Sequence, residues 1–417
     1  LVFILMNLLN IASAQIIANN VKNINGITDG AGGAIIFYKI GENFNDKGTY
    51  LQFIRSNGDL ENPIFIDTST ISEKIASDNK GGAIISWSKF IGKDDQGNFI
   101  YHEFINFVDS NGNLRFPKHQ QIFGFASSLF IASDGKDGAI IAWSDFENGE
   151  EITRINFLKS DGSFKFPKHN TIQGRAVGIA SDGNDGAIIL LYKDLVVSYN
   201  VIYSTGDLMY DDDNVFLSSS VWPIIKIMPH GKDVAIGAYK SSPGIFFPPD
   251  IYIIFIDSLG GVINPIIKFQ GTENSFEPKN DFSIDSDNLD GGIIIKNEHN
   301  KQGIFVNFFK EDGTIKFDTP LKISDNGGSP IAVSNGNGDF IIFYIVEEFR
   351  KASSLYVKFL SKNGDTKDFV KYKFIRGDAD GSKDVDMSDA IFVLLHLFRG
   401  SEAPKCLDAA DFDDSGV

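Results

Sequence analysis

The stretch that decides the fold runs from Ser133 to Trp143 and reads S-D-G-K-D-G-A-I-I-A-W, a Gly/Asp turn followed by an apolar run. Six other segments repeat the end of this stretch, and successive copies begin 49, 56, 48, 48, 58 and 47 residues apart. A regular spacing of this kind indicates one structural unit that occurs seven times. The copies other than Asp137–Trp143 begin at Gly32, Gly81, Asp185, Asp233, Gly291 and Gly338.

A second pattern recurs in step with the first. Each unit also contains a short turn such as S-N-G-D-L or S-D-G-S-F, and Asn-Gly and Asp-Gly pairs favour the tight turns that join antiparallel strands. Because two independent patterns both occur seven times, chance is a poor explanation of the repeat. The turn glycines are Gly58, Gly112, Gly162, Gly206, Gly260, Gly313 and Gly364.

Each unit is predicted to form four short strands. In the third unit these are 125–133, 139–143, 152–158 and a strand from Phe164 onward; the second is apolar throughout, as expected of a strand buried on both faces. Seven units of four strands predict an all-β, seven-bladed β-propeller over residues 15–375. Residues 15–20 are expected to close the ring by pairing near 369–374.

Charge, cysteine content and the first residues limit the possible roles. The net charge of −17 makes nucleic acid and anionic membrane surfaces poor partners, and a single cysteine, Cys406, excludes an internal disulfide. Residues 1–14 resemble the apolar core of a partial signal peptide with cleavage after Ala14. The alternative, a transmembrane helix, needs a longer apolar run. The sequence therefore predicts an extracellular protein with no membrane span.

Acidic residues near the end of the chain have the spacing of a calcium loop. Asp378, Asp380, Ser382, Asp386 and Asp389 occupy its first, third, fifth, ninth and twelfth positions, and the backbone carbonyl of the seventh residue, Asp384, would complete the oxygen ligands. An apolar helix is predicted from Asp389 to Gly400. The same spacing starts again at Asp411, Asp413 and Ser415.

A duplicated calcium loop with Asp at the twelfth position resembles a type I dockerin, an EF-hand-like module of secreted bacterial proteins. The resemblance covers residues 376–417 and implies Ca²⁺ binding and docking to a cohesin domain of another protein. Lys383 stands where such loops usually have Gly, and the second loop stops at its seventh position, so the module is expected to be truncated. The alternative is a solvated acidic tail.

No catalytic set is evident in the predicted propeller. His119 and His169 occupy matching repeat positions, which indicates a structural role. The turns at Asp134, Asp137, Asp182 and Asp185 and the segment 285–290 suggest cation sites, although Asx turns are the more common use of such residues. Phe246 and Phe247, between prolines in the segment 241–250, are a candidate binding surface whose alternative is local packing.

The sequence suggests two functions, one of a non-catalytic binding protein and one of an enzyme. The first is a non-catalytic recognition or scaffold protein that its dockerin-like module attaches to a cohesin-type partner. The second is a carbohydrate-active enzyme, a glycoside hydrolase or lyase of a cellulosome-like polysaccharide-degrading system, because dockerins are commonly joined to such enzymes. Because Asp and Glu are plentiful and their pairing depends on the fold, the sequence is compatible with a catalytic pair of carboxylates. An adhesin-like surface protein is a third possibility.

Overall fold

The structure is a computed structural model of the chain. The chain divides into two compact units, 1–369 and 370–417, and each is described by itself. The described residues are 15–42, 45–93, 95–97, 99–117, 119–123, 128–194, 196–210, 215–219, 225–230, 234–241, 250–257, 261–269, 282–297, 303–347, 353–367 and 387–399.

The first unit consists of seven antiparallel sheets, which we number as blades in chain order. Blade 1 contains β2 (Val21–Thr28), β3 (Ala34–Glu42), β4 (Asn45–Ile54) and β5 (Ile64–Asp67). Blade 2 contains β6 (Thr70–Ser77), β7 (Ala83–Lys93), β8 (Phe99–Val108) and β9 (Gln120–Phe123). Blade 3 contains β10 (Leu129–Ser133), β11 (Ala139–Glu147), β12 (Glu150–Leu158) and β13 (Asn170–Gln173).

The next three blades repeat this order. Blade 4 contains β14 (Arg175–Ser181), β15 (Ala187–Lys193), β16 (Val196–Ile202) and β17 (Val215–Ser219). Blade 5 contains β18 (Ile225–Pro229), β19 (Val234–Ser241), β20 (Asp250–Asp257) and β21 (Val262–Phe269). Blade 6 contains β22 (Phe282–Ser286), β23 (Gly291–Asn297), β24 (Ile304–Lys310) and β25 (Leu321–Ser324).

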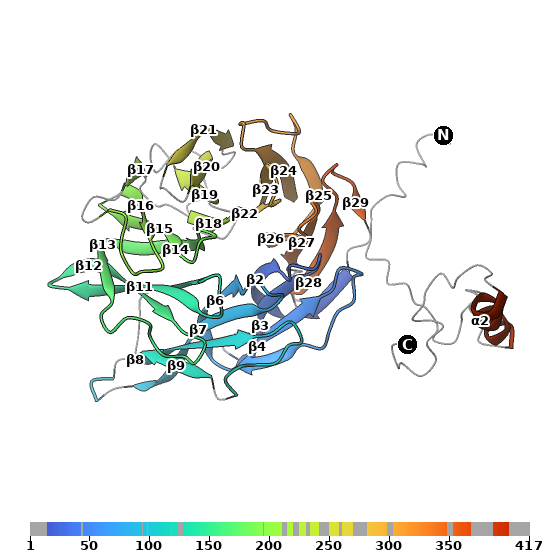
Figure 1. Cartoon of the computed structure of the whole chain (residues 1–417), viewed down its shortest axis with the longest axis horizontal. Coiled ribbons are helices and arrows are strands. Elements are labelled where there is room, and N and C mark those ends of the chain that lie inside the picture. The colour runs from blue at the N-terminus through green and yellow to red at the C-terminus, as the bar shows by residue number, and fades with distance from the viewer. Residues whose placement is uncertain are drawn as a thin grey trace. The chain divides into compact units, whose positions relative to one another are not determined.

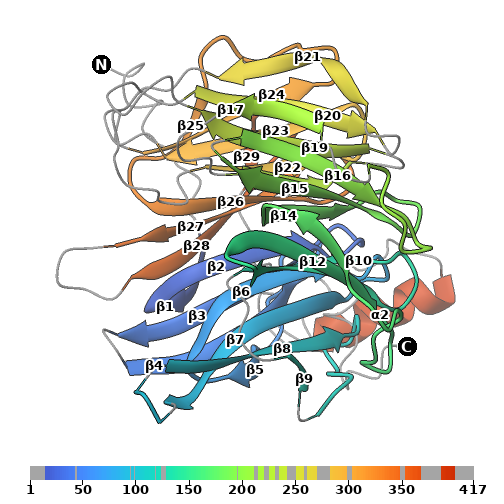
Figure 2. The same ribbon diagram turned by 90° about the vertical axis from the view of Figure 1, so that its left-hand side faces the viewer.

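Blade 7 joins the two ends of the propeller. It contains β26 (Gly328–Ser334), β27 (Phe340–Val346), β28 (Ser354–Leu360) and, as its outer strand, β1 (Gln15–Asn19). The short β29 (Thr366–Lys367) pairs with the far end of β28. The expected closing strand at 369–374 is therefore wrong as the partner of residues 15–19: β1 pairs with β28 from Ser354 to Val357 (Figure 2).

The seven blades form a closed ring. Their first strands contact one another in order, from β2 and β6 round to β26 and back to β2, and Figure 1 shows them towards the centre. The ring confirms the predicted seven-bladed β-propeller of four-stranded blades.

Apolar side chains fill the seams between neighbouring blades. Every residue of the predicted second strand Ala139–Trp143 is buried, as its uninterrupted apolar run required. In one cluster, Ile140 and Ile155 of blade 3 pack with Ile189 of blade 4. Because both faces of each sheet meet another blade, burial of apolar area holds the ring together.

The fourth strand of the unit begins later than predicted. Phe164 makes only an isolated bridge with Leu158, and the outer strand β13 starts at Asn170. The side chain of Asn156 holds the intervening loop: its Nδ2 donates to the Phe166 carbonyl (2.8 Å), and its Oδ1 accepts from the Phe166 N–H (3.2 Å). A side-chain clamp thus replaces strand pairing in this loop.

The second unit contains one described helix, α2 (Met387–Arg399), which begins two residues before the predicted start at Asp389 and ends one residue before Gly400. In the part of the chain that the structure describes, no helix is both long enough and apolar enough to cross a membrane.

Candidate functional site

In six of the seven blades, the turn after the innermost strand is closed by an acidic or amide side chain. In blade 3, Asp134 Oδ1 accepts hydrogen bonds from the N–H groups of Lys136 and Gly138, both at 2.9 Å. This arrangement confirms the Asx-turn interpretation of Asp134 and Asp182. The side chains that accept two such bonds in the other turns are Asp29, Asp78, Asp182, Asp287 and Asn335.

The second acidic residue of these turns pairs with a lysine of the preceding blade. Lys80 Nζ lies 2.5 Å from Asp137 Oδ1, and Lys136 Nζ lies 2.6 Å from Asp185 Oδ2. These exposed ion pairs connect blade 2 to blade 3 and blade 3 to blade 4. Among the described residues, no group of three or more His, Cys, Asp or Glu side chains is placed to hold a metal ion.

The acidic segment 285–290 does not converge on one point. Asp285 Oδ2 accepts from the N–H of Ser334 in blade 7 (2.5 Å), whereas Asp290 Oδ2 pairs with Lys310 (2.9 Å). Asp287 closes its own turn. The three carboxylates thus have three separate partners, which argues against the cation site considered for this segment.

His119 and His169, at matching positions of neighbouring repeats, make matching structural contacts. His119 Nδ1 lies 2.9 Å from Asn106 Nδ2, and His169 Nδ1 lies 2.9 Å from Asn156 Nδ2. Each ring also meets a tryptophan edge-to-face, with centroids 4.8 Å apart. These identical environments confirm that the two histidines are repeat elements.

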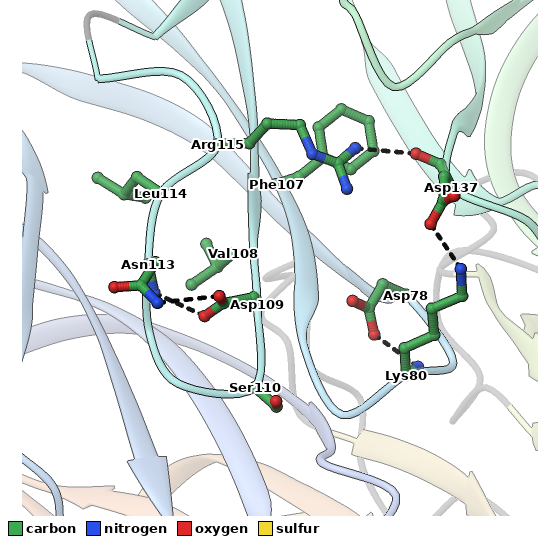
Figure 3. A pocket seen from close by; sticks show the side chains of 10 residues that line it. All are labelled: Asp78, Lys80, Phe107, Val108, Asp109, Ser110, Asn113, Leu114, Arg115 and Asp137. Carbon is green, nitrogen blue, oxygen red and sulfur yellow. Dashed lines mark hydrogen bonds and ion pairs between the residues drawn. The ribbon is translucent and has the colours of Figure 1, made fainter.

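A cavity of about 370 Å³ with both polar and apolar lining residues lies where the turns of blades 2 and 3 meet (Figure 3). Its volume falls within the range of small-ligand pockets, roughly 300–1,000 Å³. The β6–β7 turn, the end of β8 with the loop after it, and the β10–β11 turn supply its lining residues. These are Asp78, Lys80, Phe107, Val108, Asp109, Ser110, Asn113, Leu114, Arg115 and Asp137.

Fixed charges border this cavity. Arg115 Nη1 donates to the Asp137 carbonyl (2.9 Å), and its guanidinium lies 4.4 Å from the centroid of the Phe107 ring. Hydrogen bonds from Asn113 hold the pKa of Asp109 below its usual value, and Lys80 does the same for the pKa of Asp137. Both carboxylates are therefore acceptors at neutral pH, beside cationic donors. This arrangement can bind a polar ligand through hydrogen bonds.

The sequence did not single out Lys80, Asp109 or Arg115 as site residues. Arg115 and Asp137 are 22 residues apart and belong to different blades. Only the packing of one blade on the next brings them together, so a pattern within one repeat cannot reveal the cavity.

One aromatic pair of the described residues is exposed, but it is not the predicted pair. Phe246 and Phe247 lie outside the described residues. In the hairpin of blade 2, Phe90 lies near the end of β7 and Phe99 at the start of β8. Their ring centroids are 5.7 Å apart, and Phe99 is 62% exposed.

Most of the predicted calcium ligands also lie outside the described residues. These are Asp378, Asp380, Ser382, Asp384, Asp386, Asp411, Asp413 and Ser415. The twelfth-position residue, Asp389, lies in the first turn of α2, and its side chain is only 4% exposed. The helix dipole favours negative charge at this position.

The rest of α2 presents apolar side chains to solvent. Met387 and Phe398 are each 79% exposed. Apolar surface of this kind on a helix is typical of an interaction site. The other exposed apolar residues of the helix are Ile391, Leu394, Leu395 and Leu397.

No protein-family model matches the chain, and no curated protein matches it. Among solved structures, a puromycin hydrolase aligns with a TM-score of 0.51 and 9% identity over 84% of this chain and 53% of that one. An acylaminoacyl peptidase from Pyrococcus horikoshii gives 0.48 and 10% over 85% and 53%. The chain spans about half the length of these two proteins. At such identities the likeness concerns the fold alone.

Proposed function

We propose that this chain is a secreted, non-catalytic recognition propeller whose C-terminal segment binds Ca²⁺ and attaches it to a cohesin-type partner. The observation that carries the proposal is the buried carboxylate of Asp389 in the first turn of a helix with exposed apolar residues. Asp389 is also the twelfth position of the acidic loop, where the sequence spacing puts an oxygen ligand for a calcium ion.

Two further features support attachment. The exposed apolar residues of α2 would become buried on binding another protein, which provides free energy for docking. Extracellular calcium modules bind with dissociation constants of about 10⁻⁴–10⁻³ M, an affinity that suits a loop with Lys383 at its sixth position.

The propeller would supply recognition. The Asp and Asn side chains of the described turns accept hydrogen bonds from their own backbones, and the second acids pair with lysines. Carboxylates engaged in this way are poor general acids or bases. The carbohydrate-active enzyme suggested by the resemblance would need two carboxyl groups about 5–9.5 Å apart across a substrate. Steady release of reducing sugar from a purified polysaccharide would favour that alternative.

Calorimetric titration of the whole chain with CaCl₂ tests the proposal. We expect one binding transition at sub-millimolar to millimolar calcium. It should disappear in the Asp378→Ala, Asp389→Ala double variant and persist in Asp161→Asn, a control in an exposed propeller turn. Binding that the double variant retains, or no binding at all, would remove the calcium module and the attachment that depends on it.

A further inference from the structure

Blade 2 buries two carboxylates where its neighbour has uncharged side chains. Glu103 pairs with Ser88 across β8 and β7, and the equivalent residue of blade 3 is Thr153, which pairs with Ser144. Glu73 stands at the position of Leu129 in blade 3. Glu103 is 1% exposed and Glu73 is 7% exposed. Burying a carboxylate is costly, so these residues are not explained by the packing of the repeat.

Local structure holds both carboxylates in place. The pairing of β6 with β7 slips between Ile71 and Lys74, and Ser72 has a φ of 56° in this bulge. Thr70 Oγ1 donates to Glu73 Oε1 at 2.7 Å. Ser88 Oγ lies 2.8 and 2.9 Å from the two carboxylate oxygens of Glu103.

A lysine amine lies beside these carboxylates. Residues opposite each other on adjacent strands share a face of the sheet, as do alternate residues of one strand. Lys74 is opposite Ser86, and Ser88 is opposite Glu103, so these four side chains share the face that packs against blade 3. The charges of Glu73 and Glu103 both act on the Lys74 amine.

Two donors in this group lack a hydrogen-bond acceptor in the described part of the chain. The Ser86 hydroxyl is fully buried and has no partner there. The contact found for the half-buried Lys74 amine is with the Phe130 ring of blade 3, whose centroid is 5.2 Å away. Burial lowers the pKa of Lys74, although Glu73 and Glu103 act in the opposite direction. A larger share of this amine is thus neutral, and nucleophilic, than in an exposed lysine.

We propose that Lys74, with Ser86, Ser88 and Glu103, forms a carbonyl-binding site that takes a small aldehyde or ketone as an imine. The amine nitrogen forms a bond to the carbonyl carbon, and the carbonyl oxygen leaves as water. Both protons of the neutral amine end on that water molecule, and the Glu103 carboxylate carries them from nitrogen to oxygen. The Ser86 hydroxyl donates to the carbonyl oxygen as negative charge develops on it. No oxidant or reductant takes part in this step.

Blade 5 provides a matched internal control. Lys226 pairs with Ala238 in the register in which Lys74 pairs with Ser86, but Ile251 stands at the position of Glu103. Lys226 is therefore a lysine at the same place in the repeat, with Ala238 and Ile251 in place of Ser86 and Glu103. Any difference in reactivity between the two lysines reports the surroundings that are particular to blade 2.

The experiment is labelling of the whole chain with propionaldehyde and sodium cyanoborohydride, which reduces an imine to a stable secondary amine. Peptide mass spectrometry then gives the rate at each lysine from pH 6 to pH 10. Each unit by which a lysine pKa falls raises the neutral fraction about tenfold at neutral pH. We expect Lys74 to react faster than Lys226 at pH 7.5, with a rate that levels off at lower pH than that of exposed lysines.

Labelling of Lys74 no faster than Lys226 on the folded wild-type chain would overturn the proposal, and that result needs no variant. The variant Ser86→Ala makes the test sharper, because loss of one hydroxyl should slow the labelling of Lys74 and leave the labelling rate of Lys226 unchanged. Equal slowing of both lysines would indicate a general change in folding and would also count against the site.

Discussion

In blade 3, Asp134 closes its own turn with two backbone hydrogen bonds, whereas in blade 5 His230 occupies the same place and reaches into blade 6. His230 is 3% exposed; its Nδ1 lies 2.6 Å from Ser286 Oγ, and its Nε2 lies 3.0 Å from Glu311 Oε1. The common residue therefore stabilises one turn, and the exceptional residue connects two blades. A residue that departs from the repeat can therefore form a contact between two blades that the common residue does not form.

The largest effect is expected at Asp285, whose carboxylate accepts an N–H from blade 7. Burial raises the pKa of Asp285 to about 7, although hydrogen bonds from Ser334 and Ser286 oppose the shift. An acid whose pKa rises on folding stabilises the folded state at low pH, and this contribution is lost as pH rises through about 7. The free energy of unfolding of Asp285→Asn should equal that of the wild type near pH 4 and exceed it at pH 8 by up to about 4 kcal/mol.

Urea unfolding at several pH values measures this difference. Asp312→Asn is the control. The Thr314 hydroxyl holds the pKa of exposed Asp312 below its usual value, so any pH dependence there should have the opposite sign and be small. A constant stability difference between Asp285→Asn and wild type from pH 4 to pH 8 would contradict the prediction.

A smaller loss is expected when a common turn is broken. Asp182 is buried and accepts from the N–H groups of Asn184 (2.7 Å) and Gly186 (2.9 Å). Asp182→Ala leaves these donors without their acceptor and should lower the free energy of unfolding by about 2–3 kcal/mol. Asp185→Asn in the same turn removes only the exposed pair with Lys136 and should cost less than about 1 kcal/mol.

Asparagine is the right replacement at Asp185 because the residue has a φ of 68°, a conformation that alanine adopts poorly. Equal losses in the Asp182 and Asp185 variants, measured by urea unfolding, would mean that the local turn bonds do not carry the stability of blade 4.

A smaller loss than that of Asp182→Ala is expected at the contact between blades 5 and 6. His230→Ala removes two hydrogen bonds, but Ser286 Oγ keeps Asn288 Oδ1 as a partner at 3.2 Å, and Glu311 is partly exposed to water. The free energy of unfolding should fall by about 1–2 kcal/mol. Hydrogen exchange should rise in β18 and β22 together, because the link joins two blades. Faster exchange confined to blade 5 would show that His230 serves only its own turn.

The repeat made the propeller architecture predictable from the sequence. It gave no information on the side-chain contacts between neighbouring blades. The run Ala139–Trp143 predicts its strand because every residue is apolar, and the Asp-Gly turns fix the hairpins. The start of β13 was missed because Asn156, a polar residue inside a strand, holds the loop through its side chain. The contacts of Arg115 and His230 were missed because their partners belong to other blades, and a pattern within one repeat does not show which residues of neighbouring blades meet. The proposed ligands before Asp389 stay a prediction.

The closing strand has a consequence for the order of folding. The Ser353 hydroxyl donates to the carbonyl of Val21, 332 residues away in the chain, and β1 lies on β28 beside this contact. Hairpins of blades 1 to 6 need only neighbouring residues and can form while the chain is still being synthesised. Blade 7 must wait for its last strands, and its first-made strand stays without a partner until then. Ring closure is therefore a late folding step that joins residues far apart in the chain, and we expect it to limit the folding rate of the propeller.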